Sequence, residues 1–400
     1  MDKNRPLLID RHRQLQQQRA IASRLRRLHQ LEARDGAFVR IEGRRYLGFA
    51  DNDYLGLADH PALRQAALAA VEQEGVGARS AHLLLGHGRE HAALEAEIAD
   101  WLGQPAALLF GSGYLANLGV LQGLLSPADL CVQDKLNHAC LLDGAKLSGA
   151  LLRRYPHADV AAAERQLSGA GERAALLATD GVFSMDGDLA PLPELAALCR
   201  RERALLYVDD AHGAGVLGPQ GRGSAAALGL AASDLPLQLV TLGKAFGAFG
   251  GVVAGQREWI DALLQSARSY LFATALPSAI AAAARAALQL IRGDQGEQRR
   301  QQLNARIAQF RRAGAQLGLP LQDSRTAIQP LLLGSDARCL QIAAALAERG
   351  FWVGAIRPPT VAEGQARLRI ALSARHSESD IDQLLQALAV VMLDHPGGLK

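Results

Sequence analysis

The chain has 400 residues, of which 49% are hydrophobic and 4% aromatic, and its formal net charge is +3. At about 150 residues per domain, this length predicts two or three domains, or one large and one small domain. The small net charge and the dispersed basic residues argue against nucleic-acid binding. No apolar run reaches the roughly 18 residues that a membrane helix needs. We therefore expect neither a nucleic-acid nor a membrane partner.

The first residues, MDKNRPLLIDRHRQ, contain no apolar signal-peptide core, so we expect a cytoplasmic protein. No CxxC pair occurs among the four cysteines, at positions 131, 140, 199 and 339. In a chain without an export signal, they are expected to be reduced thiols that serve as small core residues.

Residues from about Asp10 to Leu31 show helical spacing of apolar side chains, which predicts an amphipathic helix lying on the main body. The alternative is that Arg26 or Arg27 reaches an anionic substrate. The next stretch, FVRIEGRRYLGFA, predicts a hairpin. It leads into the polar turn DNDYLGL, where the Asn52 amide could face a ligand.

A helix is expected from His60 to Val71, because Pro61 suits the first helical turn. The stretch that follows, EGVGARSAHLLLGHGREH, places His87 and His91 four residues apart, which is the spacing of a helical zinc pair. The glycines beside His87 argue against a helix there, and HExxH is absent. We expect no metal site and favour a loop that approaches a ligand.

Residues 106–110 predict a strand, and the following GSGYLANLGVLQGLL predicts a glycine-rich turn and a helix. This order offers backbone N–H groups to a phosphate. Gly113 and Tyr114 are the residues nearest the predicted helix start. A single GSG is a weak signal, because glycine turns join many strands to helices.

Two more apolar runs end in polar residues. One leads to Asn137 and His138, and the other, Leu176 to Thr179, leads to Ser184. Strands separated by helices in this rhythm favour a parallel or mostly parallel sheet with helices on both faces. Taken alone, His138 is more often an ordinary loop histidine.

Two further apolar runs, Leu205–Val208 and Leu237–Leu242, deliver Asp209 and His212 and then Thr241 and Lys244. Ligands of open α/β sheets bind beyond the carboxyl ends of the strands. A lysine can form a Schiff base with an aldehyde, and an aspartate can keep a pyridine nitrogen protonated. The joint placement therefore predicts a pyridoxal phosphate site.

After Gly251 the chain alternates helix-like and strand-like segments, which predicts a smaller C-terminal α+β domain. We expect three parts, 1–50, 51–290 and 291–400. The segment RPPTVAEGQARLRI places Arg367 and Arg369 on the same side of a strand. Either could bind a carboxylate bidentately, and the alternative is a solvated edge-strand arginine.

The motifs DNDYLGL, GVFSMDGDLAPL, VDDAHGAGVLGPQGRGS, TLGKAFG and IRPPTV together resemble those of the α-oxoamine synthases. The resemblance covers the chain from about Leu25 to Leu385. It implies a fold-type-I pyridoxal phosphate transferase that joins an amino acid to an acyl thioester with loss of carbon dioxide. Such enzymes have a large domain with a mostly parallel sheet and a smaller α+β domain, and they act as homodimers.

The resemblance also implies a role for individual residues. Lys244 would form the Schiff base, Asp209 would bind the pyridinium nitrogen, and His138 would stack on the ring. The remaining cofactor contacts would come from His212 and Ser184 at the ring hydroxyl, and from Gly113, Tyr114, Thr241 and the neighbouring chain's Thr274 at the phosphate. The substrate contacts would come from Asn52 and Arg369 at the amino-acid carboxylate, and from Thr360 and Arg26 along the acyl path.

The segments AIRPPTV and ARLRIALSARH favour the family member that condenses L-alanine with a pimeloyl thioester of coenzyme A or acyl-carrier protein. A sister synthase with another thioester stays open as an alternative, as does a fold-type-I aminotransferase or lyase. Two departures affect local contacts. The chain reads ARSAHLLLGH where many relatives have a GGSR-like stretch, and Ala273 replaces a hydroxyl residue.

Overall fold

The computed structural model describes residues 7–169 and 171–396, so the first six residues of the predicted N-terminal part lie outside it. Contacts within the chain define two compact units, which we describe separately. Unit 1 comprises residues 1–51, 185–187 and 304–400, and unit 2 comprises residues 52–184 and 188–303. The division into 1–50, 51–290 and 291–400 stays a prediction.

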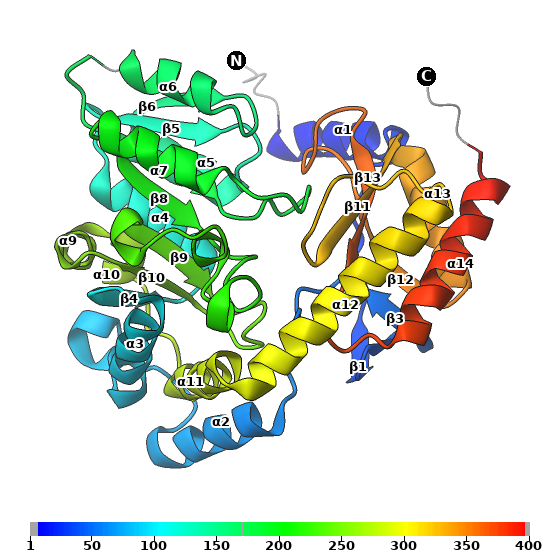
Figure 1. Ribbon diagram of the computed structural model, residues 1–400, viewed down its shortest axis with the longest axis horizontal. Helices are drawn as coiled ribbons and strands as arrows, with labels where there is room; N and C mark the ends of the chain where they lie inside the picture. Colours follow the sequence, from blue (N-terminus) through cyan, green and yellow to red (C-terminus); the bar gives the residue numbers. More distant parts are fainter. Residues whose placement is uncertain (1–6, 170, 397–400) are drawn as a thin grey trace, which may run out of the picture. The chain divides into compact units, whose positions relative to one another are not determined.

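Unit 2 is built on a seven-stranded sheet in the order β4-β10-β9-β8-β7-β5-β6 (Figure 1). Strand β10 is antiparallel to both of its neighbours, and the other pairs are parallel. This confirms the predicted mostly parallel sheet. The strands are β4 (Ala106–Phe110), β5 (Leu130–Asp134), β6 (Leu151–Tyr155), β7 (Ala175–Asp180), β8 (Leu205–Asp209), β9 (Leu237–Thr241) and β10 (Gly251–Gly255).

Helices cover both faces of this sheet, because successive strand residues point to opposite sides and both sides are apolar. Tyr207 packs with α4, α5, α9 and α10 on one face, and its neighbours Leu206 and Val208 pack with α6, α7 and α8 on the other. The helices are α2 (Pro61–Glu74), α3 (Arg89–Leu102), α4 (Gly113–Leu124), α5 (Ala139–Ser148), α6 (Val160–Ser168), α7 (Leu192–Arg201), α8 (Ser224–Ala227), α9 (Arg257–Ser266), α10 (Arg268–Leu271) and α11 (Ser278–Arg292).

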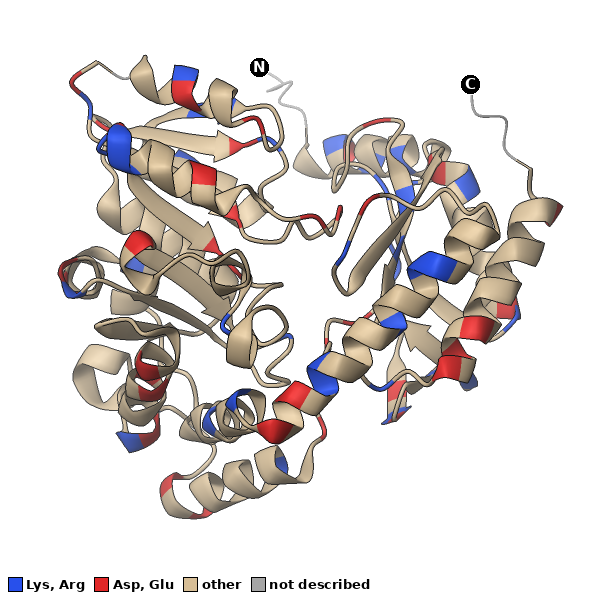
Figure 2. Ribbon diagram, in the orientation of Figure 1, with Lys and Arg blue, Asp and Glu red and all other residues tan. Residues whose placement is uncertain are grey.

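Charged residues of unit 2 lie mainly on helices and loops, and the strands are mostly tan in Figure 2. Short helical turns occur at His82–Gly86 (π), Pro219–Gly221 and Ala232–Asp234 (both 3₁₀). Helix α12 (Asp294–Gln316) continues from unit 2 into unit 1. No helix in the described part of the chain is long and apolar enough to cross a membrane.

Unit 1 contains a six-stranded sheet in the order β1-β2-β3-β12-β13-β11, in which only the β3–β12 pair is parallel. The predicted hairpin is present as β2 and β3. The strands are β1 (Leu31–Asp35), β2 (Phe38–Ile41), β3 (Arg44–Phe49), β11 (Ile328–Gly334), β12 (Phe351–Ile356) and β13 (Ala366–Ala371). The helices that begin and end within unit 1 are α1 (Leu8–Ile21), α13 (Asp336–Glu348) and α14 (Glu378–Asp394).

The predicted helix from Asp10 to Leu31 was wrong in extent and in packing. Helix α1 ends at Ile21, and it buries none of its residues. Ser23 adopts a left-handed backbone conformation (φ 58°), and the next residue, Arg24, pairs with Asp336 and Glu363. Contacts with distant residues therefore override the helical spacing of the sequence.

The short segment Met185–Gly187 belongs to unit 1 by its contacts, although its neighbours in sequence belong to unit 2. The Arg367 guanidinium lies 2.5 Å from the Asp186 carboxylate and donates to the Met185 carbonyl. The hydroxyls of Ser324 and Thr326 both donate to the Gly187 carbonyl. Gly187 has φ +73°, which an L side chain rarely adopts.

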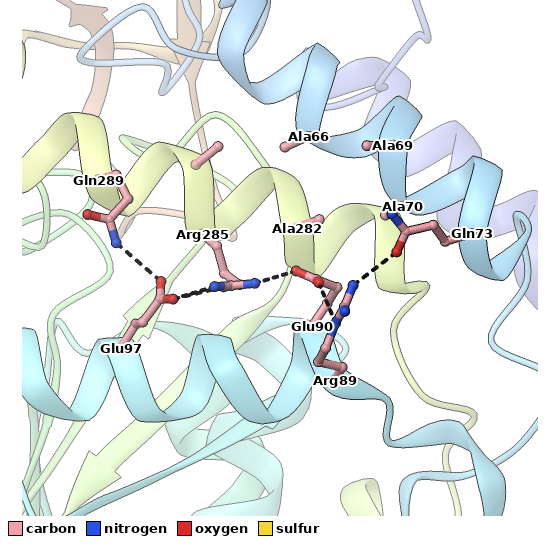
Figure 3. A pocket seen from close by; sticks show the side chains of 11 residues that line it. Ala66, Ala69, Ala70, Gln73, Arg89, Glu90, Glu97, Ala282, Arg285 and Gln289 are labelled. Atoms are coloured by element: carbon pink, nitrogen blue, oxygen red, sulfur yellow. Dashed lines mark hydrogen bonds and ion pairs between the residues drawn. The ribbon is translucent and has the colours of Figure 1, made fainter.

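Helices α2, α3 and α11 pack together around a cavity of about 310 Å³ that is lined in part by an ion-pair cluster (Figure 3). Arg285 of α11 lies 2.6 Å from both Glu90 and Glu97 of α3. Glu90 is only 8% exposed. A buried carboxylate needs such a partner, because loss of hydration otherwise disfavours its charge.

Arg285→Ala is expected to lower the free energy of unfolding by about 2 kcal/mol, because the buried Glu90 then keeps only the 3.4 Å contact with the exposed Arg89. The control is Arg292→Ala on the same helix, whose pair with Asp100 is exposed and should contribute about 0.5 kcal/mol or less. Urea titration followed by circular dichroism measures both changes. Equal losses in the two variants would contradict the structural role of Arg285.

A second, half-buried ion cluster follows the ends of β5 and β6. His157 Nδ1 lies 3.2 Å from Asp134 and its Nε2 lies 2.6 Å from Asp188. Burial alone would lower the pKa of His157, but the hydrogen bonds to the two carboxylates outweigh burial and raise this pKa to about 10. The imidazolium form is therefore stabilised in the folded protein.

The stabilisation by His157 should be complete below pH 6.5, its pKa in an unfolded chain, and should disappear as the pH rises through 10. At pH 6 we expect His157→Gln to be less stable than the wild type by about 2 kcal/mol, with the difference shrinking toward pH 10. Urea midpoints across this range give the measurement, with His12→Gln on exposed α1 as the control. A difference that does not change with pH would refute the assignment.

Candidate active site

The carboxyl ends of the central strands of unit 2 surround a cavity of about 180 Å³. Eight of the residues predicted from the sequence line it together, namely Gly113, Tyr114, His138, Ser184, Asp209, His212, Thr241 and Lys244. The cavity lies where open α/β sheets place their ligands. The structure therefore brings a carboxylate, an amine and a helix N-terminus to one place.

The Asp209 carboxylate is held from two sides at the end of β8, where it is 4% exposed. Asn117 Nδ2 donates to its Oδ2 at 2.6 Å, and the Ala211 N–H donates to its Oδ1 at 3.0 Å. The Tyr207 hydroxyl in turn donates to Asn117 Oδ1 at 2.7 Å, and burial raises the pKa of Tyr207, which keeps its proton on. The sequence prediction missed Asn117. The available signal was the Asn117 amide among the apolar residues of the helix GYLANLGVLQGL, since a buried amide needs partners.

The Lys244 amine meets His212 in a short chain of polar contacts. Lys244 Nζ lies 2.8 Å from His212 Nε2, and His212 Nδ1 lies 2.7 Å from the Tyr54 hydroxyl. The Tyr54 hydroxyl donates to Asn52 Oδ1 at 3.0 Å. The predicted ligand-facing amide Asn52 is thus connected to the predicted Schiff-base lysine through Tyr54, which the sequence prediction also missed.

His138 caps the N-terminus of α5 and borders the cavity. Its ring Nδ1 accepts from the Cys140 backbone N–H at 3.3 Å and lies 2.7 Å from Cys140 Sγ. The backbone N–H of His138 donates to the Asp180 carboxylate. Burial, and then the nearby Lys244 charge, lower the pKa of His138 against an opposing effect of Asp209. A neutral, flat ring at this position suits stacking on a cofactor.

The N-terminus of α4 forms the other end of the cavity. The Ser112 hydroxyl accepts from the Leu115 N–H, and Gly113 and Tyr114 occupy the first turn. A Cβ on Gly113 would lie 3.4 Å from the Thr241 hydroxyl, so these two predicted phosphate contacts are neighbours. Helix N–H groups and a hydroxyl fit a phosphate. With the fixed Asp209 carboxylate and the Lys244 amine, this donor set fits pyridoxal phosphate.

The other predicted residues lie elsewhere. Arg26, Thr360 and Arg369 belong to unit 1, where Arg26 Nη2 lies 3.5 Å from the Thr360 hydroxyl. Thr274 is exposed and forms an isolated β-bridge with Ala81 outside the cavity lining.

The alternative of a solvated edge-strand arginine is wrong for both Arg367 and Arg369. Strand β13 lies inside its sheet, between β12 and β11, and the two side chains are 6% and 7% exposed. Arg367 pairs with Asp186. Arg369 thus stays as the proposed carboxylate ligand.

The histidine pair that raised the question of zinc is interrupted, as the glycines indicated. Helix α3 begins at Arg89, so it contains His91 but not His87. Within residues 7–169 and 171–396, no group of three or more His, Cys, Asp or Glu side chains is arranged to hold a metal ion.

Known proteins match the chain over most of its length. A family model described as aminotransferase class I and II matches residues 44–388. The 8-amino-7-oxononanoate synthases of Xanthomonas euvesicatoria pv. vesicatoria (strain 85-10) and Xanthomonas campestris pv. campestris (strain B100) are each 52% identical over 385 residues. This match covers 96% of this chain and 96% of each relative.

Solved structures agree with this match. A serine palmitoyltransferase from S. paucimobilis with bound PLP and myriocin has a TM-score of 0.92 at 26% identity, covering 98% of this chain and 99% of that one. The 8-amino-7-oxononanoate synthase from Francisella tularensis has a TM-score of 0.76 at 30% identity, covering 87% of this chain and 98% of that one. The chain therefore belongs to the class I and II aminotransferase family and, within it, to the 8-amino-7-oxononanoate synthases.

Proposed function

We propose that the protein condenses L-alanine with a pimeloyl thioester to give 8-amino-7-oxononanoate, carbon dioxide and the free thiol carrier, a step of biotin biosynthesis. The observation that carries the proposal is the cavity in which Lys244, the fixed Asp209 carboxylate and the α4 N-terminus meet. The relatives that are 52% identical bear the name of this activity.

When bound, pyridoxal phosphate supplies an aldehyde that forms a Schiff base with an amine and a ring that accepts an electron pair. Lys244 would bind the aldehyde, Asp209 would hold the proton on the pyridine nitrogen, and His138 would stack on the ring. His212 and Ser184 would contact the ring hydroxyl. The phosphate would be held by Gly113, Tyr114, Thr241 and, from the neighbouring chain, Thr274.

Proton transfer falls to the Lys244 amine. When it is not bound to the aldehyde, Lys244 Nζ would take the proton from Cα of alanine as a general base, and His212 Nε2, at 2.8 Å, could accept a proton from Nζ. Asn52 and Arg369 would bind the alanine carboxylate, because an amide N–H and a guanidinium suit that group. Thr360 and Arg26 would line the acyl path, and the thioester carrier is coenzyme A or acyl-carrier protein.

A sister α-oxoamine synthase activity is the second candidate, because the serine palmitoyltransferase structure has a TM-score of 0.92. The cofactor residues would be shared, so the substrates must discriminate. Product formation from alanine, glycine or serine with pimeloyl, acetyl, succinyl or palmitoyl thioesters separates these activities. A reaction that needs no thioester would instead indicate an aminotransferase or a lyase.

Homodimer formation is also part of the proposal. An apolar patch that we call the leucine patch comprises Leu83, Leu84, Leu85 and Phe272, which are 53%, 75%, 91% and 71% exposed. Thr274 follows Phe272 by two residues, and its β-bridge to Ala81 joins the two chain segments that carry the leucine patch. A second copy covering the patch would bring Thr274 to that copy.

All four cysteines are free and buried, which supports a cytoplasmic location.

Lys244→Ala is expected to abolish the visible absorbance of the lysine–pyridoxal phosphate Schiff base and to reduce product formation by more than about a thousandfold. Lys146→Ala, on the exposed face of α5, is the matched control and should keep both signals. Absorbance spectra and product assays with alanine and pimeloyl coenzyme A give the measurement. A wild-type protein without this absorbance would refute the proposed function.

The double variant Leu84→Glu and Leu85→Glu is expected to sediment as a monomer, because charges in the leucine patch oppose its burial. Leu393→Glu, a 79% exposed leucine on α14, should leave the oligomeric state unchanged. Sedimentation velocity distinguishes the two species. A dimeric double variant would exclude this patch as the interface.

A further inference from the structure

A buried tyrosine joins two groups that the proposed function uses separately. Tyr54 is 1% exposed, its hydroxyl donates to Asn52 Oδ1 at 3.0 Å, and the same hydroxyl lies 2.7 Å from His212 Nδ1. The other nitrogen of that ring, Nε2, lies 2.8 Å from Lys244 Nζ. The four side chains thus form one continuous line of polar contacts from amine to amide.

The number of protons fixes the direction of these contacts. A phenol has one proton, so a tyrosine that donates to Asn52 accepts from His212. His212 then carries its proton on Nδ1 and presents the lone pair of Nε2 to Lys244. A lysine ammonium group can only donate, and it meets that lone pair at hydrogen-bond distance. Donation therefore runs from Lys244 to His212, then to Tyr54, and then to Asn52.

We propose that Tyr54 is a positioning residue that sets the tautomer of His212 and the orientation of the Asn52 amide. The inference rests on the proposed function. With Nδ1–H held by Tyr54, His212 Nε2 is the acceptor that can take a proton from Lys244. An amine must be unprotonated to attack the aldehyde of pyridoxal phosphate. The Tyr54 oxygen also accepts from the imidazolium that this transfer produces.

The second consequence concerns the substrate side. Because Asn52 turns its oxygen to Tyr54, its Nδ2 lies on the opposite side of the amide group. Only the nitrogen of an amide can donate, and a carboxylate can only accept. Tyr54 thus selects the amide orientation that suits an amino-acid carboxylate.

The charge of Lys244 also acts on two titratable groups nearby. Lys244 opposes the rise of the Asp180 pKa, which burial and the Asp209 carboxylate cause. The Lys244 charge also helps burial to lower the pKa of His138. Both groups feel the Lys244 charge directly, whereas Tyr54 contacts the far nitrogen of His212.

Tyr54→Phe removes the hydroxyl and keeps the ring, and Tyr155→Phe is the matched control because Tyr155 is also 1% exposed and lies outside the cavity lining. Absorbance gives the rate at which full-length protein stripped of cofactor captures added pyridoxal phosphate at different pH values. For Tyr54→Phe we expect capture about tenfold slower at neutral pH, because Nε2 is no longer held as the acceptor of the Lys244 proton, and a pH profile that differs from that of the wild type. The KM for alanine should rise more than kcat falls, because Asn52 loses its orientation. Tyr155→Phe should match the wild type.

Nuclear magnetic resonance of ¹⁵N-histidine in the same cofactor-free proteins reads the tautomer directly, with His212→Gln identifying the signal. We expect Nδ1–H in the wild type and a shift toward Nε2–H in Tyr54→Phe. An Nε2–H tautomer in the wild type, or identical pH profiles in the wild type and Tyr54→Phe, overturns the inference. If Tyr54→Phe does not fold, the wild-type tautomer alone decides. Failure of the wild type to capture pyridoxal phosphate would overturn the proposed function, and the tautomer would still decide this inference.

Discussion

The buried Asp209 carboxylate is the constraint on which the rest of the site depends. A carboxylate that is 4% exposed needs hydrogen-bond donors in place of water, and Asn117 and the Ala211 N–H supply them. Asn117 in turn depends on the Tyr207 hydroxyl, on the strand that carries Asp209. The packing of α4 against the sheet therefore serves two purposes. It directs an amide to Asp209 and places the helix N-terminus at the same cavity.

The parallel strands explain why residues far apart in sequence act together. Strands β5, β7, β8 and β9 run in the same direction, so the chemistry that follows each of them collects at one edge of the sheet. His138, Ser184, Asp209 and Lys244 reach the cavity in this way. Because all of these strands are buried on both faces, their ends are fixed more firmly than a loop would allow.

The sequence was sufficient for those parts of the site that a strand end determines. Short apolar runs predicted β4, β8 and β9 almost to the residue, and the polar groups after them line one cavity. It was insufficient where a contact joins distant segments, as for Asn117 with Asp209 and for Tyr54 with His212. Periodicity also misled at the N-terminus, where Leu25 and Leu28 continue the helical spacing but are exposed and lie beyond the end of α1. Alternation could place Arg367 and Arg369 on one side of a strand, but only the pairing of β13 showed that both are buried.

The segment Met185–Gly187 has a consequence for fragments of this protein. A truncated protein made of residues 52–303 would keep Asp186 but lose Arg367, and it would keep the Gly187 carbonyl but lose both of its hydroxyl donors, Ser324 and Thr326. Gly187 would then have no hydroxyl contacts at its carbonyl to hold its left-handed backbone conformation. Ser184 borders the cavity and is joined to Met185 by a peptide bond. Loss of the contacts that hold residues 185–187 would therefore disturb a residue of the cofactor site. Cutting the gene at the two outer boundaries of the larger unit therefore does not yield an intact domain.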